Sequence, residues 1–357
     1  MSTPRRVRTG SVEPPRRAAR GATDHAVTPT RRHAAAIETA GDTDRQAERE
    51  AVAPPGRPRS STSGRRRRQS LLATRVEEQS AHLRAPRPRS SRRSRRQLTV
   101  LLACHGGVGA TTIATSIGAL VAQGGRRACI VDLDLQFGGV LSTLNLKGRF
   151  PLSEIAAELR AHGRSGLDKE LLRGRLPRWG DALWVASQVG CVEGLAELEA
   201  DRLGALLEQI KRCFDVTLVD GLRDFNDLAL AALDVADRVV LVVTQDVPAL
   251  RGLAARLDIL RRLGYEASEL HVVLNRYSEK GLVPVEAIVE SLGVRPSFLV
   301  ANDFKTVHRA INDGVPLAVG AAQARVTQSV AALVEGLFAV PVSAARPGLW
   351  QRLLGGR

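Results

Sequence analysis

Short apolar runs alternate with longer amphipathic stretches along the chain from residue 98 onward. Apolar runs rich in Val, Leu and Ile predict seven buried strands, at 98–104, 128–133, 182–187, 215–220, 238–244, 270–275 and 297–300. Apolar residues at helical spacing predict eight helices, at 111–123, 151–161, 199–212, 227–236, 248–262, 284–292, 304–313 and 322–338. The alternation predicts an α/β fold, with a mostly parallel sheet covered by helices on both faces.

The first 97 residues follow a different pattern, with few large apolar residues and much Arg, Pro, Ser and Ala. Such a segment buries too little apolar surface to offset its ordering entropy, so we predict a disordered tail over 1–97. The tail holds 24 arginines, no lysine and 9 acidic residues, whereas the other 260 residues hold 28 basic and 28 acidic ones. The chain's net charge of +15 therefore lies in this long basic tail.

The Arg clusters at 65–68 and 92–96 suit contacts with phosphate. Nucleic acid, an anionic membrane surface or an acidic protein are candidate ligands of residues 1–97, and a solvated spacer is the alternative. At the other end, 341–357 forms a second tail in which Leu349, Trp350, Leu353 and Leu354 would share one helical face. Membrane binding, docking to a partner and packing on its own domain are all open for this segment.

The chain holds no apolar run of the length of a signal peptide within residues 1–97, and none that approaches a membrane span. We therefore expect a cytoplasmic protein, with peripheral binding at the inner face of the cell membrane left open. The four cysteines form no C-x-x-C pair and are expected to be reduced core residues; they are Cys104, Cys129, Cys191 and Cys213. The globular domain is predicted to span 98–340.

A glycine-rich turn joins the first predicted strand to the first predicted helix. Gly106, Gly107 and Gly109 let backbone N–H groups converge, and the helix that follows adds the positive end of its dipole. The usual phosphate-binding loop has the form G-x-x-x-x-G-K-[ST]. Here Cys104 stands at the first glycine position and Ala110 at the lysine position, so this pattern alone leaves an ordinary strand-to-helix turn open.

Polar side chains also follow the other predicted strands. Asp132 and Asp134 come after the second strand, Asp220 closes a later apolar strand in the manner of a Walker B aspartate, and Asn275 closes another. Ligands of open parallel sheets bind outside the carboxyl ends of the strands, so these side chains are expected at one crevice. For each carboxylate, a helix cap or a salt bridge is the alternative.

Taken in order, these segments resemble the MinD/ParA family of P-loop ATPases, which carry a deviant Walker A motif. Within that family they are most similar to the CpaE/TadZ proteins of type IV (Tad/Flp) pilus and related secretion systems. The resemblance spans about 98–340 and is carried by 106–112, 132–138, 220–226, 275–277 and 302–317. CpaE proteins often have a receiver-like domain at the N-terminus, which residues 1–97 do not resemble.

The resemblance implies that the protein binds ATP and Mg²⁺. Thr111 would ligate Mg²⁺, and Asp220 would hold the metal through water. Asp134 would position the attacking water, Thr112 would contact a phosphate, and Asn275 would read the adenine edge. The nucleotide-binding residues would be Asn275 with Gly106, Gly107, Val108, Gly109, Ala110, Thr111 and Thr112.

Both lysines of the family motif are replaced. His105 stands where the signature lysine reaches the phosphate of the other subunit, and Ala110 where the P-loop lysine bridges the β- and γ-phosphates. A trans-acting cation can be worth about 10³–10⁵ in the rate of phosphoryl transfer, so we expect turnover to be very slow or absent. Arg223 is a candidate catalytic residue that would replace part of the missing charge, and an ion pair with Asp224 or Asp227 is the alternative.

These expectations favour a CpaE/TadZ-like ATP-binding protein with a degenerate Walker A motif. It would dimerise and act as a scaffold or positioning factor for a pilus or secretion machine at the inner membrane, with weak or no hydrolysis. Its partners would be a second copy of the chain and proteins of that machine. The alternative is an active ParA/MinD-type ATPase that positions cargo, chromosomes or the septum and contacts DNA or membrane through the basic tail.

Overall fold

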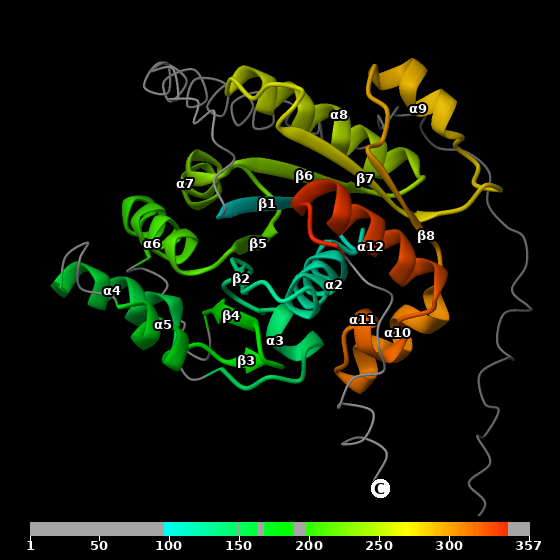
Figure 1. Ribbon diagram of the computed structural model, residues 1–357. Coiled ribbons are helices and arrows are strands. Elements are labelled where there is room, and N and C mark those ends of the chain that lie inside the picture. Colours follow the sequence, from blue (N-terminus) through cyan, green and yellow to red (C-terminus); the bar gives the residue numbers. More distant parts are fainter. Residues whose placement is uncertain (1–95, 149, 163–167, 189–197, 342–357) are drawn as a thin grey trace, which may run out of the picture. The chain divides into compact units, whose positions relative to one another are not determined.

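A single eight-stranded sheet organises the part of the chain that the computed structural model describes, which comprises residues 96–148, 150–162, 168–188 and 198–341 (Figure 1). The strand order is β3-β4-β2-β5-β1-β6-β7-β8, and every neighbouring pair is parallel except β3 and β4. The strands are β1 (Gln97–Ala103), β2 (Ala128–Asp132), β3 (Arg178–Trp179), β4 (Leu183–Ser187), β5 (Val216–Leu222), β6 (Arg238–Val243), β7 (Leu270–Tyr277) and β8 (Phe298–Ala301).

Helices cover both faces of this sheet. The helices are α2 (Ala110–Gln123), α3 (Val140–Thr143), α4 (Leu152–His162), α5 (Lys169–Arg175), α6 (Ala200–Cys213), α7 (Asp227–Val235), α8 (Val247–Arg262), α9 (Val285–Leu292), α10 (Phe304–Asp313), α11 (Leu317–Gly320) and α12 (Arg325–Phe338). Helix α2 packs on β2 and β5, and α3, α11 and α12 pack beside it; α6, α7 and α8 lie on the opposite face (Figure 1). Because both faces are covered, β2 and β4 are buried along their whole length.

The sequence-based prediction of the α/β fold is confirmed. The seven predicted strands and eight predicted helices are present, and most of their ends agree within two residues. Four short elements were not predicted, namely β3, α3, α5 and α11. Each has seven residues or fewer, too few for the apolar period to repeat. Helix α12 begins at Arg325 rather than at 322, because the preceding residues form a turn.

Several expectations concern the two tails. Apart from Arg96, Gln97 and Pro341, the segments 1–97 and 341–357 lie outside the described residues, and so do their Arg clusters and the amphipathic stretch at 349–354. Gln97 opens β1, so the first strand begins one residue earlier than predicted. Within the described ranges, the structure holds no helix that combines the length and the apolar character needed to span a membrane.

The cysteines that the structure describes are free and buried, as expected for core residues; they are Cys104, Cys129 and Cys213, while Cys191 lies outside the described ranges. Burial raises the pKa of Cys104 to about 12, and the nearby Arg256 guanidinium opposes this rise only in part. The Cys104 thiol therefore stays protonated at neutral pH and is a packing residue at the end of β1.

Candidate functional site

The carboxyl ends of β1, β2, β5 and β7 meet around a cavity of about 350 Å³. The connection after β1 runs through α2 to β2, whereas the connection after β5 runs through α7 to β6 on the other side of β1. A crevice opens where neighbouring connections diverge in this way, and open α/β sheets bind their ligands there. The described lining residues are Ala103, His105, Gly106, Gly107, Val108, Gly109, Ala110, Thr111, Thr112, Asp134, Asp220, Gly221, Leu222, Arg223 and Arg276.

The glycine-rich turn forms one wall of this cavity. Gly107 and Gly109 have positive φ angles of 76° and 89°, a conformation that favours glycine. A Cβ atom on Gly106 or Gly107 would meet nothing within 4 Å, so both residues border open space. A Cβ atom on Gly109 would lie 2.6 Å from Nδ2 of Asn275, so only glycine lets β7 approach the turn so closely.

Two side chains at the end of β7 hold this turn from behind. Asn275 Nδ2 donates to the Val108 carbonyl at 2.7 Å, and Arg276 Nη2 donates to the Gly107 carbonyl at 2.9 Å. The backbone N–H groups of residues 106–109, in contrast, have no acceptor among the described residues. With its carbonyls held by β7 and its N–H groups without acceptors, the turn can bind an anion, and the start of α2 adds its dipole.

Asn275 does not line the cavity, because it lies buried beneath the turn. Its Nδ2 group is already used by Val108, so the residue fixes the conformation of the phosphate-binding turn. Contact between Asn275 and an adenine stays a prediction. The other residues predicted from the glycine motif, Gly106 to Thr112, all line the cavity.

Thr111 and Asp220 also line the cavity. Both carboxylate oxygens of Asp220 are buried without a hydrogen-bond partner among the described residues. Burial raises the pKa of this carboxyl group, while the Thr111 hydroxyl and the Gly221 N–H, which lie close to it but outside full hydrogen-bond geometry, oppose the rise. A buried carboxylate without partners is costly, and it suits a hard divalent cation that takes oxygen ligands. The residues predicted to hold Mg²⁺ thus lie together and have the chemistry to do so.

Asp132 is not among the lining residues, but it fixes the segment that carries Asp134. It lies opposite Asp220 in the pairing of β2 with β5, and its two carboxylate oxygens accept from the N–H groups of Asp134 and Val140, each at 3.0 Å. These bonds fold the segment after β2 so that Asp134 reaches the cavity. Burial raises the pKa of Asp132 to about 6, and the neighbouring Asp220 carboxylate adds to the rise.

Asp134 and Arg223 form an ion pair at the mouth of the cavity, with Nη2 of Arg223 at 2.9 Å from Oδ2 of Asp134. The Arg223 side chain is 68% exposed. The sequence left open an ion pair of Arg223 with Asp224 or Asp227. The structure corrects the partner to Asp134, because the loop after β2 folds back onto the end of β5. Gly221 allows this approach, because a Cβ atom there would lie 2.2 Å from the Asp134 nitrogen.

Arg256 and Arg276 were not predicted as site residues. Arg256, on α8, donates to the Cys104 carbonyl at 3.1 Å and to the Arg223 carbonyl at 2.7 Å, and so joins the two loops that flank the crevice. Its place in an amphipathic helix gave no signal in the sequence. Arg276 directly follows Asn275, and that position at the end of a predicted strand was a signal that could have been used.

The two positions of the missing lysines also lie at this cavity. His105 is exposed, with Nδ1 3.0 Å from the Gly106 carbonyl oxygen. Ala110 is buried at the start of α2. Neither side chain places a fixed positive charge at the phosphate-binding turn.

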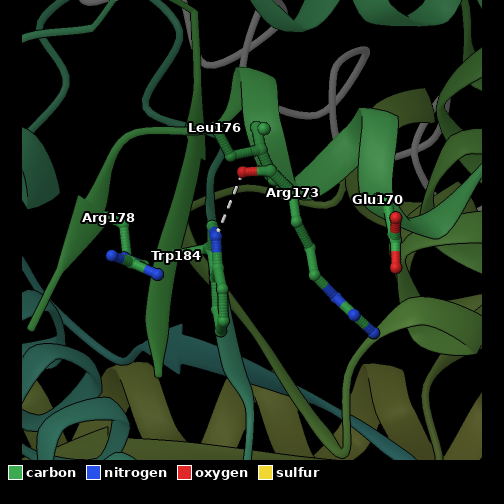
Figure 2. A pocket seen from close by; sticks show the side chains of 6 residues that line it. Glu170, Arg173, Leu176, Arg178 and Trp184 are labelled. Atoms are coloured by element: carbon green, nitrogen blue, oxygen red, sulfur yellow. Dashed lines mark hydrogen bonds between the residues drawn. The ribbon is translucent and has the colours of Figure 1, made fainter. Parts of the chain in front are cut away.

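A second hollow, of about 450 Å³, lies between α5 and the β3–β4 edge of the sheet (Figure 2). Figure 2 shows the Trp184 indole N–H donating to the Arg173 carbonyl at 3.2 Å, with Arg178 beside the ring. The Arg173 guanidinium itself donates to the Cys213 carbonyl at 2.7 Å, although its Nε lies buried without a partner. Among the described residues of this wall, no carboxylate oxygen is buried without a partner, and Glu170 is exposed.

Known proteins match about two thirds of the chain. No protein-family model matches it. The septum site-determining protein MinD of Thermotoga maritima is 23% identical over 225 residues, which is 62% of this chain and 80% of that protein. Among solved structures, the ParA family ATPase from Chlorobium tepidum TLS has a TM-score of 0.63 at 19% identity and covers 68% of this chain and 100% of its own. MinD of Pyrococcus horikoshii OT3, complexed with Mg-ADP, has a TM-score of 0.57 at 18% identity, over 68% of this chain and 95% of its own.

The likeness thus extends over 80–100% of each of these relatives and over about two thirds of this chain. The parallel sheet, the crevice between β1 and β5 and the glycine turn at the start of α2 agree with it. The chain has the MinD/ParA P-loop NTPase fold, and its homologues and structural neighbours are MinD and ParA family ATPases.

Proposed function

We propose that this protein is a CpaE/TadZ-like member of the MinD/ParA ATPases that binds a magnesium–nucleotide complex and hydrolyses it weakly or not at all. In this proposal the bound nucleotide holds a dimer together, and the dimer serves as a scaffold or positioning factor for a pilus or secretion machine at the inner membrane. The cavity at the carboxyl edge of the sheet supports the nucleotide site. The sequence resemblance over 302–317 supports the CpaE/TadZ branch.

One observation carries the nucleotide site: two groups of polar atoms without protein partners line the same cavity. The N–H groups of residues 106–109 lack acceptors among the described residues, and the two buried oxygens of Asp220 lack donors. A buried carboxylate without a partner is costly, and the exposed N–H groups of Gly106 and Gly107 can exchange water for an anion, so a ligand that satisfies both is favoured. An anion bound together with a divalent cation meets this requirement, and a magnesium-bound polyphosphate is such a ligand.

The residues present fit that ligand. The turn at 106–109 and the N-terminus of α2 would receive the phosphates, and Thr111 and Asp220 would hold Mg²⁺ through oxygen. When bound, the metal would neutralise phosphate charge. Asp134 stands at the mouth of the cavity, where a carboxylate can accept a hydrogen bond from water and orient it.

Slow hydrolysis follows from the charges at the site. His105 and Ala110 leave the phosphate side without either lysine, and phosphoryl transfer is accelerated mainly by stabilising negative charge. In addition, Asp134 shares its charge with Arg223, which weakens its ability to orient water. Both features affect the transition state more than the binding of the nucleotide.

Dimerisation is proposed from the family resemblance. Phe137 lies in the loop that follows Asp134, and it is 86% exposed. Phe137 is therefore a candidate contact residue of the proposed dimer. The machinery that the dimer recruits is proposed from the CpaE/TadZ resemblance alone.

The second candidate is an active ParA/MinD-type ATPase that positions cargo, chromosomes or the septum and contacts DNA or membrane through the basic tail. Arg223 at the mouth of the cavity favours it, since an arginine can supply part of the charge that the lysines would give. The relatives named above include a septum site-determining protein and a ParA family ATPase.

Calorimetry with the full-length protein tests the nucleotide site, with ATP, ADP and AMP each titrated with Mg²⁺ and again with a chelator. Binding that depends on Mg²⁺ is the expected result, and no binding of any of the three would overturn the proposal. A phosphate-release assay in the same buffer separates the two candidates. Turnover at the rate of an ordinary MinD protein measured alongside would favour the active ATPase.

A further inference from the structure

We propose that Arg276, at the end of β7, supplies the positive charge that the missing lysines would give to the phosphates. The cation would thus come from the strand beside the glycine turn and not from the turn itself. This inference rests on the proposed nucleotide site and names the residue that completes its phosphate side. Arg223, the sequence-based candidate for this task, becomes a partner of Asp134.

The position of Arg276 supports this assignment. Its guanidinium lines the cavity and donates through Nη2 to the Gly107 carbonyl at 2.9 Å. It therefore lies directly beside the N–H groups that would receive the phosphates. The side chain is exposed, so it can change its rotamer without disturbing the core.

A comparison of the two arginines at the cavity supports it further. Arg223 forms an ion pair with the Asp134 carboxylate, so the pair carries no net charge. Arg276 donates to a neutral carbonyl, so its charge is not cancelled by this contact. Asp246, which caps α8, accepts from the Thr244 hydroxyl and the Ala249 N–H, and the charges of His105 and Arg276 act on it through space and lower its pKa. No ion pair of Arg276 with Asp246 occurs among the described residues.

The backbone at Arg276 has an uncommon conformation. Its φ angle is 53°, in the left-handed region that residues other than glycine rarely adopt. The pairing of β7 with β8 shifts register between Leu274 and Tyr277, and Tyr277 accepts from the Asn302 N–H at 2.9 Å. The structure thus holds an arginine in a conformation that glycine or asparagine would adopt more easily.

Arg276 has two tasks under this proposal. Without a ligand it holds the Gly107 carbonyl, and with a ligand its remaining N–H donors reach phosphate oxygens. A guanidinium has five donors in a planar fork, so it can keep one bond to the turn while it makes others to an anion. Charge-assisted hydrogen bonds of this kind correspond to about tenfold to hundredfold in affinity.

The test is calorimetry of Mg-ATP, Mg-ADP and AMP with full-length wild type and with Arg276→Ala, Arg276→Lys and Arg276→Gln. Lysine keeps the charge, whereas glutamine keeps an N–H donor for Gly107 without the charge. We expect alanine and glutamine to lower Mg-ATP affinity tenfold or more and AMP affinity less, and lysine to restore most of the loss. Arg295→Ala is the matched control, because Arg295 lies in the exposed loop that enters β8 at the opposite edge of the sheet.

The outcomes separate this inference from the nucleotide site itself. Wild-type binding with an unchanged Arg276→Ala value would overturn the inference alone. An Arg276→Gln protein that binds like wild type, or an equal loss for all three nucleotides, would show that Arg276 only braces the turn, and would also overturn it. A larger loss in Arg223→Ala would transfer the assignment to Arg223 and overturn it as well. No binding by the wild type would overturn the proposed function, and this inference with it.

Discussion

The two hollows of this molecule differ in chemistry more than in size. The hollow beside α5 is the larger, at about 450 Å³, yet its arginines bind a backbone carbonyl or lie beside the Trp184 ring. The cavity at the carboxyl edge is smaller, at about 350 Å³, yet it gathers free N–H groups, an unpartnered carboxylate and a cation from four strand ends. Unsatisfied polar groups of opposite kind identify a binding site better than volume does.

The largest effect is expected from substituting Gly221. The matched substitution of Gly174, a glycine of the second hollow, tests whether the two hollows differ. Gly221→Ala would place a Cβ atom 2.2 Å from the Asp134 nitrogen at a φ of 89°, whereas Gly174→Ala in the second hollow would meet nothing within 4 Å. We expect Gly221→Ala to lose about 2–4 kcal/mol of stability and all detectable nucleotide binding. Gly174→Ala should keep both. Denaturant unfolding and calorimetry measure the two quantities, and equal behaviour of the pair would break the comparison.

Asp220→Asn is expected to have the next largest effect. Its buried carboxylate has a raised pKa, so folding disfavours its charged form, and removing the charge should leave the protein as stable or slightly more stable. Mg²⁺-dependent nucleotide affinity should fall tenfold or more, since the cation loses an anionic ligand. Thermal unfolding and calorimetry, with and without a chelator, report both changes. Unchanged Mg²⁺ dependence would contradict the assignment of Asp220.

A smaller effect is expected from pH. The pKa of Asp132 is raised to about 6 by burial and, to a lesser degree, by the Asp220 carboxylate. The unliganded protein therefore takes up a proton as the pH falls through about 6, and a cation bound nearby favours the loss of that proton. Mg-nucleotide binding should release protons at pH 6 and weaken several-fold between pH 7 and 5. Calorimetry in two buffers with different ionisation enthalpies measures the proton count, and a count of zero would refute this linkage.

The smallest effect is expected in the second hollow. Arg178→Ala removes a guanidinium 5.9 Å from the centre of the Trp184 ring, a contact worth about 0.5–1 kcal/mol at an exposed site. Nucleotide affinity should stay within the error of the wild-type value. Calorimetry and thermal unfolding of this variant provide the check. A clear loss of nucleotide affinity would mean that the two hollows are coupled.

The residues at the strand ends show how much of the site could be predicted from the sequence. Asp134 and Asp220 were placed correctly at one cavity, because parallel strands bring their carboxyl ends to the same edge. The partner of Arg223 was predicted among its sequence neighbours, whereas the fold brings Asp134 to it from the loop after β2. Arg256 was missed, because its bonds to the Cys104 and Arg223 carbonyls join segments far apart in the chain.

The sequence by itself determined the order of strands and helices, the glycine turn and the absence of both lysines, since each depends on residues close together in the chain. The tertiary structure decided which carbonyls hold that turn, which carboxylate stays unpartnered and which arginine keeps its charge free of an ion pair. These properties depend on contacts between β1, β2, β5 and β7, and no local pattern encodes the distances between strands whose neighbours are set by the order of the sheet. The residue types of the site could therefore be predicted from the sequence, whereas the pairing of their charges required the tertiary structure.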